Sequence, residues 1–99
     1  MIEHIVLYNF SKDITEDVID QTIEKFRQCR DLVEGFMSIE YGENCSPKIE
    51  KSSGFNYGII MKFENEHALS AYYDLEEHKE AKQIMDEFLI NKLIFDINW

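Results

Sequence analysis

The chain has 99 residues, of which 44% are hydrophobic, and this is enough for one domain with a small core. Twenty acidic and ten basic residues give a net charge of −10, which repels phosphate backbones and anionic membranes. We therefore expect neither nucleic acid nor a membrane as a partner. The N-terminus is too acidic and its apolar run too short for a signal peptide, so we expect a cytoplasmic protein.

Two cysteines, Cys29 and Cys45, lie sixteen positions apart, and neither has a histidine or cysteine partner at the spacing of a zinc site. The sequence thus indicates reduced thiols, with Cys29 in the core and Cys45 in a loop. We interpret the acidic residues of 74–80 as a solvated helix start and not as a cation site. We expect no metal and no cofactor.

The first strand is expected at residues 2–10, where both alternating sets of side chains are largely apolar, as in a central strand covered on both faces. A helix follows, because Thr15 can cap its start and an apolar stripe leads to an end near Gly35. The stripe consists of Ile19, Ile23, Phe26, Cys29 and Val33.

Residues 36–41 alternate as a second strand, with Met37, Ile39 and Tyr41 on its apolar side. Residues 42–53 contain glycine, asparagine, serine and proline without periodicity, and they predict a loop long enough to act as a flap. A third strand is expected at 55–63, where the odd positions are apolar or aromatic.

Two helices are expected after this strand. Asn65 can cap the first of them, and Asp74 with Glu77 predicts the capping pair of the second, which runs from 75 to about 89. Tyr72 and His78 are six positions apart, so both can face the sheet only if the helix breaks near Asp74. His78 then lies in a first helical turn and faces inward.

With a last strand at 92–99, the order is βαββαβ. This order predicts an α+β ferredoxin-like fold, a four-stranded antiparallel sheet with helices on one face, in a single domain of residues 1–99. The other face, carrying Ile5 and Leu7, is left bare. Burial of apolar surface at ~25 cal/mol/Å² favours association, so we expect a homodimer with two sheets face to face.

Several short motifs, taken in order, resemble those of one family. They are His4-Ile5-Val6-Leu7-Tyr8-Asn9-Phe10, Gly35, Gly54-Phe55, Phe63-Glu64-Asn65, Ala71-Tyr72 with His78, and Leu93-Ile94-Phe95-Asp96. Over nearly the whole chain they resemble the stress-responsive A/B barrel, or Dabb, family. The resemblance implies a dimeric ferredoxin-like α+β barrel and implies no single activity, because most members have no settled function.

The resemblance also implies positions for a site. A plant member of the family, a polyketide cyclase, closes its substrate by an intramolecular aldol condensation, and its functional positions correspond to His4, Tyr72 and His78 here. The implied apolar pocket walls are Val6, Phe26, Ile59, Leu89 and Ile94.

Strand alternation places His4 and Tyr57 on the helix-facing side, where Tyr72 and His78 arrive from the helices. Imidazole beside phenol can act as an acid–base pair, so a pocket holding all four residues is a candidate catalytic site. The alternative interpretation is a hydrogen-bonded core without function. The helix N-terminus favours neutral His78 and the nearby carboxylates favour its charged form, so the sequence leaves its protonation open.

Three functions remain open. The first is an enzyme or binding protein with cyclase-like or lyase-like acid–base chemistry on a small neutral aromatic or polyketide-like ligand. The second is a non-catalytic dimer in a stress-response or accessory role, in which the same residues only fill the core. The third is a monooxygenase without cofactor, which rests on fold analogy alone. The sequence identifies no particular ligand, no role for residues 42–53 and no assembly larger than a dimer.

Overall fold

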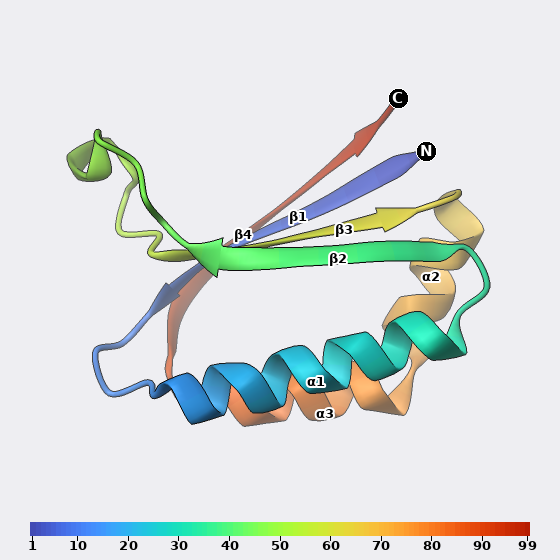
Figure 1. The fold of residues 1–99 in the computed structure, drawn as a ribbon, viewed down its shortest axis with the longest axis horizontal. Coiled ribbons are helices and arrows are strands. Elements are labelled where there is room, and N and C mark those ends of the chain that lie inside the picture. The colour runs from blue at the N-terminus through green and yellow to red at the C-terminus, as the bar shows by residue number, and fades with distance from the viewer.

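The secondary structure follows the predicted βαββαβ order, and the computed structural model describes all 99 residues (Figure 1). The elements are β1 (Ile2–Phe10), α1 (Glu16–Leu32), β2 (Phe36–Glu43), a 3-10 helix η1 (Ile49–Lys51), β3 (Tyr57–Phe63), α2 (Glu66–Asp74), α3 (Glu76–Asp86) and β4 (Leu89–Asn98). None of the helices is both long and apolar enough to cross a membrane.

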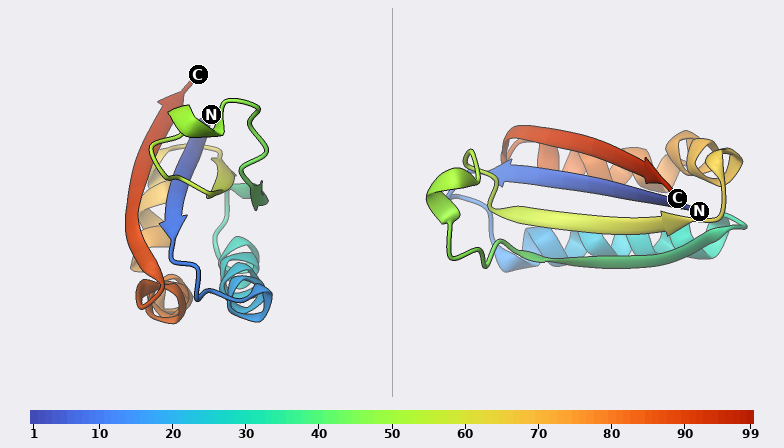
Figure 2. Two further views of the ribbon diagram at one scale, coloured as in Figure 1. Left: turned by 90° about the vertical axis from the view of Figure 1, so that its left-hand side faces the viewer. Right: turned by 90° about the horizontal axis from the view of Figure 1, so that it is seen from above.

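The four strands form one antiparallel sheet in the order β2-β3-β1-β4, so β1 pairs with both β3 and β4. The expected central position of the first strand is confirmed. The α-helices lie on one face of the sheet, with α1 and α3 side by side (Figure 1, Figure 2). This is the ferredoxin-like α+β fold that the sequence predicts.

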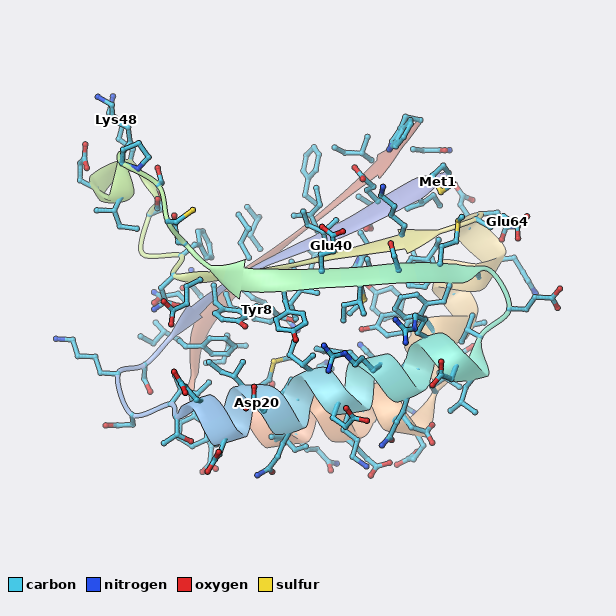
Figure 3. All side chains as sticks on the ribbon, in the orientation of Figure 1. Met1, Tyr8, Asp20, Glu40, Lys48 and Glu64 are labelled. Atoms are coloured by element: carbon cyan, nitrogen blue, oxygen red, sulfur yellow. The ribbon has the colours of Figure 1, made fainter.

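The core lies between the sheet and the helices. Along β1 every even residue from Ile2 to Phe10 is buried, whereas the odd residues between them are only half-buried. In Figure 3, Tyr8 lies on the side of the sheet that faces the helices, and Glu40 of β2 lies on the open side. The other elements contribute the buried residues Ile23, Phe26, Cys29, Phe36, Ile59, Met61, Phe63, Tyr72, Ala81 and Met85.

Two predicted helix caps are confirmed and one is wrong. The side chains of Thr15 and Asn65 each accept the backbone N–H three residues on, at 3.3 and 3.0 Å. Asp74 is instead the last residue of α2, and the residue that precedes α3 is Leu75, which makes no side-chain capping bond. The backbone of Leu75 is extended, with ψ of 141°, and this interrupts the helix between α2 and α3. The side chain of Leu75 packs against the core, which holds the break at this residue.

Three strands also differ from the prediction. β3 begins at Tyr57 and not at residue 55, and β2 extends to Glu43, into the segment 42–53 that was expected to be a loop and that also contains η1. In β2 a register irregularity between Phe36 and Ser38 moves Phe36 onto the buried face where Met37 was expected, and Met37 is 53% exposed. β4 begins at Leu89 and not at residue 92, because its pairing with β1 continues as far as Phe10. The helix α3 therefore ends at Asp86 and not near residue 89 as predicted.

The face of the sheet opposite the helices has no covering element (Figure 2). Leu93 and Phe95 of β4 lie on this face, are 48% and 58% exposed, and pair with Leu7 and Ile5 of β1. A contiguous apolar surface of this kind marks an interaction site.

Candidate functional site

A cavity of about 110 Å³ lies between the sheet and the helices, with residues of β1 and β4 on one side and of α1, α2 and α3 on the other. Two histidines, three tyrosines and two lysines line it, and Val6, Phe26, Met85 and Ile94 complete its wall. One water molecule occupies about 30 Å³ of liquid. The cavity can therefore hold a few waters or a small ligand.

His4 lies in the middle of β1, faces the helices and is 2% exposed. Its Nδ1 is 2.6 Å from Oδ1 of Asp96, because the pairing of β1 with β4 places the two residues opposite each other. A carboxylate only accepts, so His4 donates from Nδ1–H, and in the neutral ring the free lone pair is on Nε2. Nε2 lies 3.5 Å from the Tyr73 hydroxyl. An imidazole oriented by a carboxylate in this way is suited to take up a proton.

Tyr72 and Tyr73, the last aromatic residues of α2, are hydrogen-bond donors at neutral pH. Tyr72 is 2% exposed, and its ring centroid lies 5.5 and 5.4 Å from those of Phe36 and Phe63. Burial raises the pKa of Tyr72, and burial followed by the negative charge of Asp96 raises the pKa of Tyr73. Both phenols stay protonated and can donate to an oxygen that gains negative charge.

His78 lies in the first turn of α3, and its ring centroid is 4.6 Å from that of Tyr72. Burial, then the positive charges of Lys82 and Lys92, and then His4 lower the pKa of His78 to about 4, while the backbone carbonyl of Tyr73 opposes the shift. His78 is therefore neutral at pH 7, which answers the question that the sequence leaves open. Its Nδ1 is buried and has no hydrogen-bond partner in the protein.

The structure brings together most, but not all, of the residues expected at the site. Tyr57, Ile59 and Leu89 do not line the cavity. Tyr57 pairs with Tyr8 near one end of β1, Leu89 opens β4 near that same end, and Ile59 is packed in the core at 2% exposure. The expected residues that do line the cavity are His4, Val6, Phe26, Tyr72, His78 and Ile94.

Sequence reasoning missed six residues at this site. Five of them line the cavity, namely Tyr8, Tyr73, Lys82, Met85 and Lys92, and the sixth is Asp96, which contacts His4. A signal was present for three of them. Lys82 follows His78 by four positions, which is one helical turn. Lys92 and Asp96 alternate along β4 with the expected wall residue Ile94, so all three share the helix-facing side.

A larger hollow of about 470 Å³ lies beside Leu7 and Gly58, under the loop that follows β2. Its titratable lining residues are Glu43, Cys45 and Tyr57, and it contains no histidine or lysine. Burial raises the pKa of Tyr57, which keeps this phenol protonated. The larger hollow therefore lacks an imidazole, and we place the candidate site at the smaller cavity, which holds two.

Neither cysteine adds a reactive group to that cavity. Both are free, with Cys29 buried and Cys45 exposed. Burial, with the negative charge of Glu77 adding to it, raises the pKa of Cys29 to about 12, so this thiol is inert. No group of three or more histidine, cysteine, aspartate or glutamate side chains is arranged to hold a metal ion.

The sequence profile of the stress-responsive A/B barrel domain, Dabb, matches residues 2–99. The chain belongs to the Dabb family. No curated protein matches the sequence of this Dabb chain significantly.

Solved structures show that the fold of this Dabb chain is shared widely. A dimeric ferredoxin-like protein of unknown function from Jannaschia sp. CCS1 is 21% identical with a TM-score of 0.80, over 99% of this chain and 98% of that chain. A similar dimeric protein from Thermobifida fusca YX is 17% identical with a TM-score of 0.78, over 99% and 90%. Hydroxynitrile lyase from Passiflora edulis is 16% identical with a TM-score of 0.79, over 98% and 93%. At these identities the similarity shows the fold alone.

Proposed function

We propose that this Dabb protein is a small-molecule enzyme whose cavity performs acid–base chemistry on a ketone. His4 Nε2 removes a proton from the carbon next to the carbonyl group, and Tyr72 donates a hydrogen bond to the carbonyl oxygen as it becomes an enolate. The observation that carries the proposal is the pair of His4 and Asp96, 2.6 Å apart, beside a cavity lined by protonated tyrosines.

The proton that leaves the carbon moves to Nε2, and the imidazolium of His4 is then stabilised by the carboxylate of Asp96. Return of the proton to the carbon regenerates the ketone. In an aldol reaction the same carbon instead attacks a second carbonyl group, the carbon–carbon bond forms, and the alkoxide left on that group takes the proton back from Nε2 of His4. Neutral His78 offers a further polar contact, since a buried nitrogen without a partner is normally satisfied by water or a ligand.

The cavity limits the size of the ligand. Its volume of about 110 Å³ is below the range of about 300–1,000 Å³ that is typical of drug-sized pockets, so it fits a small molecule or the reacting end of a larger one. The rings of Phe26, Tyr72 and Tyr73 around it favour a planar or polyketide-like group. The description of a protein of the same fold as a hydroxynitrile lyase supports lyase-like chemistry by analogy of fold only.

We also propose that the protein is a homodimer through the face of the sheet that carries no helices. The proteins from Jannaschia and Thermobifida are described as dimeric. In this chain Leu93 and Phe95 belong to an apolar surface that water would otherwise cover. A two-fold axis through this face would bury that surface in both protomers.

Exchange of α-protons tests the proposed chemistry. Wild-type protein in D₂O should speed deuterium incorporation next to the ketone of levulinate, followed by proton NMR. His4→Gln should slow the catalysed exchange by about 10² or more, and Tyr72→Phe and Asp96→Asn should slow it to a smaller extent. His67→Gln is the matched control, because His67 is exposed on α2 and does not line the cavity.

The same variants separate the proposal from a purely structural role. If His4 and Tyr72 only fill the core, wild-type protein gives no exchange above the background. In that case His4→Gln leaves the rate of exchange unchanged. It lowers the free energy of unfolding by ~1–3 kcal/mol, because Asp96 loses its buried partner. That pair of results would support the non-catalytic accessory dimer.

A further inference from the structure

The cavity is positively charged although the chain is strongly acidic. The net charge is −10, yet no carboxylate lines the cavity, and two of its lining residues are Lys82 and Lys92. The lysines come from different elements, α3 and β4. A cleft lined by one sign of charge concentrates the opposite ion, so this site attracts anions against the overall charge of the molecule.

Neither lysine has a carboxylate partner. The ion pairs of the chain join Lys25, Arg27, Arg30 and Lys62 to acidic groups. Lys82 and Lys92 are both half-buried and take part in none of them. A partly desolvated ammonium group without a carboxylate within ion-pair distance is unfavourable, and an anionic ligand supplies that contact.

Lys82 and Lys92 line the same cavity as the proposed acid–base residues. Both lysines lower the pKa of His78, after burial. Burial lowers the pKa of Lys92 as well, and Lys82 adds to this shift while Asp86 opposes it. An anion bound by the lysines would therefore share this cavity with His78 and with the ring of Tyr72 beside it.

We propose that Lys82 and Lys92 bind the carboxylate of a small keto acid whose ketone lies between His4 and Tyr72. This inference rests on the proposed function, because it names the substrate class of the same cavity. A keto acid takes the place of the neutral ligand that was expected from the sequence. That expectation did not include Lys82 or Lys92 among the residues of the site. Each lysine presents a compact charge on a flexible stem, and a planar carboxylate is smaller than a phosphate group, which suits a cavity of about 110 Å³.

Levulinate and levulinamide, a keto acid and its neutral amide of nearly the same shape, provide the test. Dissociation constants come from NMR titrations of the full chain at low salt, read at the histidine rings. Wild-type protein should bind levulinate at least about tenfold more tightly than levulinamide. Lys92→Met and Lys82→Met should each remove most of this preference, and both keep an unbranched stem that packs like lysine.

Lys79→Met is the matched control, because Lys79 is exposed on the same helix and does not line the cavity. This variant should keep the full preference for levulinate. Circular dichroism of each variant checks the fold, and the two cavity variants come from different elements, so misfolding of one leaves the other to decide.

Each adverse result points to a different failure. Equal affinity of wild-type protein for levulinate and levulinamide, with both shifting the signals of His4 and His78, would overturn the carboxylate site and leave the proposed function intact. Tighter binding of inorganic phosphate with the same lysine dependence would also overturn it, in favour of a phosphate ester. If neither compound shifts these histidines and neither exchanges its protons, the proposed function itself fails.

Discussion

At the scale of single residues, His78 is held neutral by burial and by two lysines, and this makes a direct prediction about pH. Its folded pKa is about 4, against about 6.5 for an ordinary histidine. Between these values the unfolded chain binds a proton that the folded chain does not. The free energy of unfolding should therefore rise with pH from about 4 to about 6.5 through this group and stay constant above.

NMR titration of the histidine rings measures this shift. Because the side chain is only half-buried, solvent screening limits its contribution to about 1–2 kcal/mol. The difference in stability between wild type and His78→Gln should show the same pH dependence, since the many carboxylates titrate alike in both proteins. A midpoint near pH 6.5 for His78 would contradict the account.

The residues of the site were only partly predictable for a physical reason. His4, Tyr72 and His78 carry recognisable chemistry and lie on inward faces that local periodicity identifies. Asp96 meets His4 only through the register of β1 against β4. Register is a property of two distant segments, so no local pattern places this carboxylate on the imidazole.

At the scale of elements, the start of α2 allows a comparison of two caps. Asn65→Ala should lower the free energy of unfolding by about 1 kcal/mol, because its side chain accepts the Ala68 N–H at 3.0 Å. Asp74→Ala should change it by less than about 0.5 kcal/mol, because Asp74 is exposed, ends α2 and caps no helix. Urea denaturation measures both. Equal losses in the two variants would show that Asp74 does cap α3.

Errors in the predicted elements occur where long-range contacts override local signals. Asp74 and Glu77 have the spacing of a capping pair, but packing of Leu75 against the core places the helix break one residue later. In β2 the alternation predicts Met37 inside, and the register irregularity against β3 selects Phe36 instead. Local propensity is weak beside tertiary packing in both cases.

At the scale of the whole molecule, the open face of the sheet predicts a dimer that one charge can disrupt. Leu93→Glu should give a monomer or an aggregate, because a charge without a partner in a buried interface costs several kcal/mol. Leu32→Glu is the matched control, since Leu32 is 57% exposed and belongs to α1 on the other side of the molecule. Analytical ultracentrifugation should find this control dimeric. A monomeric wild-type protein at micromolar concentration would exclude the interface.

The fold as a whole was the most predictable level. Two-residue and three-to-four-residue periods alternate clearly along the chain, and the βαββαβ order leaves few ways to cover one face of a sheet. The charge of the cavity was less predictable. The overall excess of acidic residues disfavours anionic partners, whereas the fold gathers two of the ten basic residues at one cavity without a carboxylate in its lining.

The central claim is that the cavity beside His4 and His78 is a ligand site. Ring-nitrogen NMR of the three histidines, with and without levulinate, tests it most directly. The account predicts that free His4 carries its proton on Nδ1, and that levulinate shifts the signals of His4 and His78 and leaves those of His67 unchanged. A proton on Nε2 of free His4, or unchanged His4 and His78 signals at high millimolar levulinate and levulinamide, would contradict it.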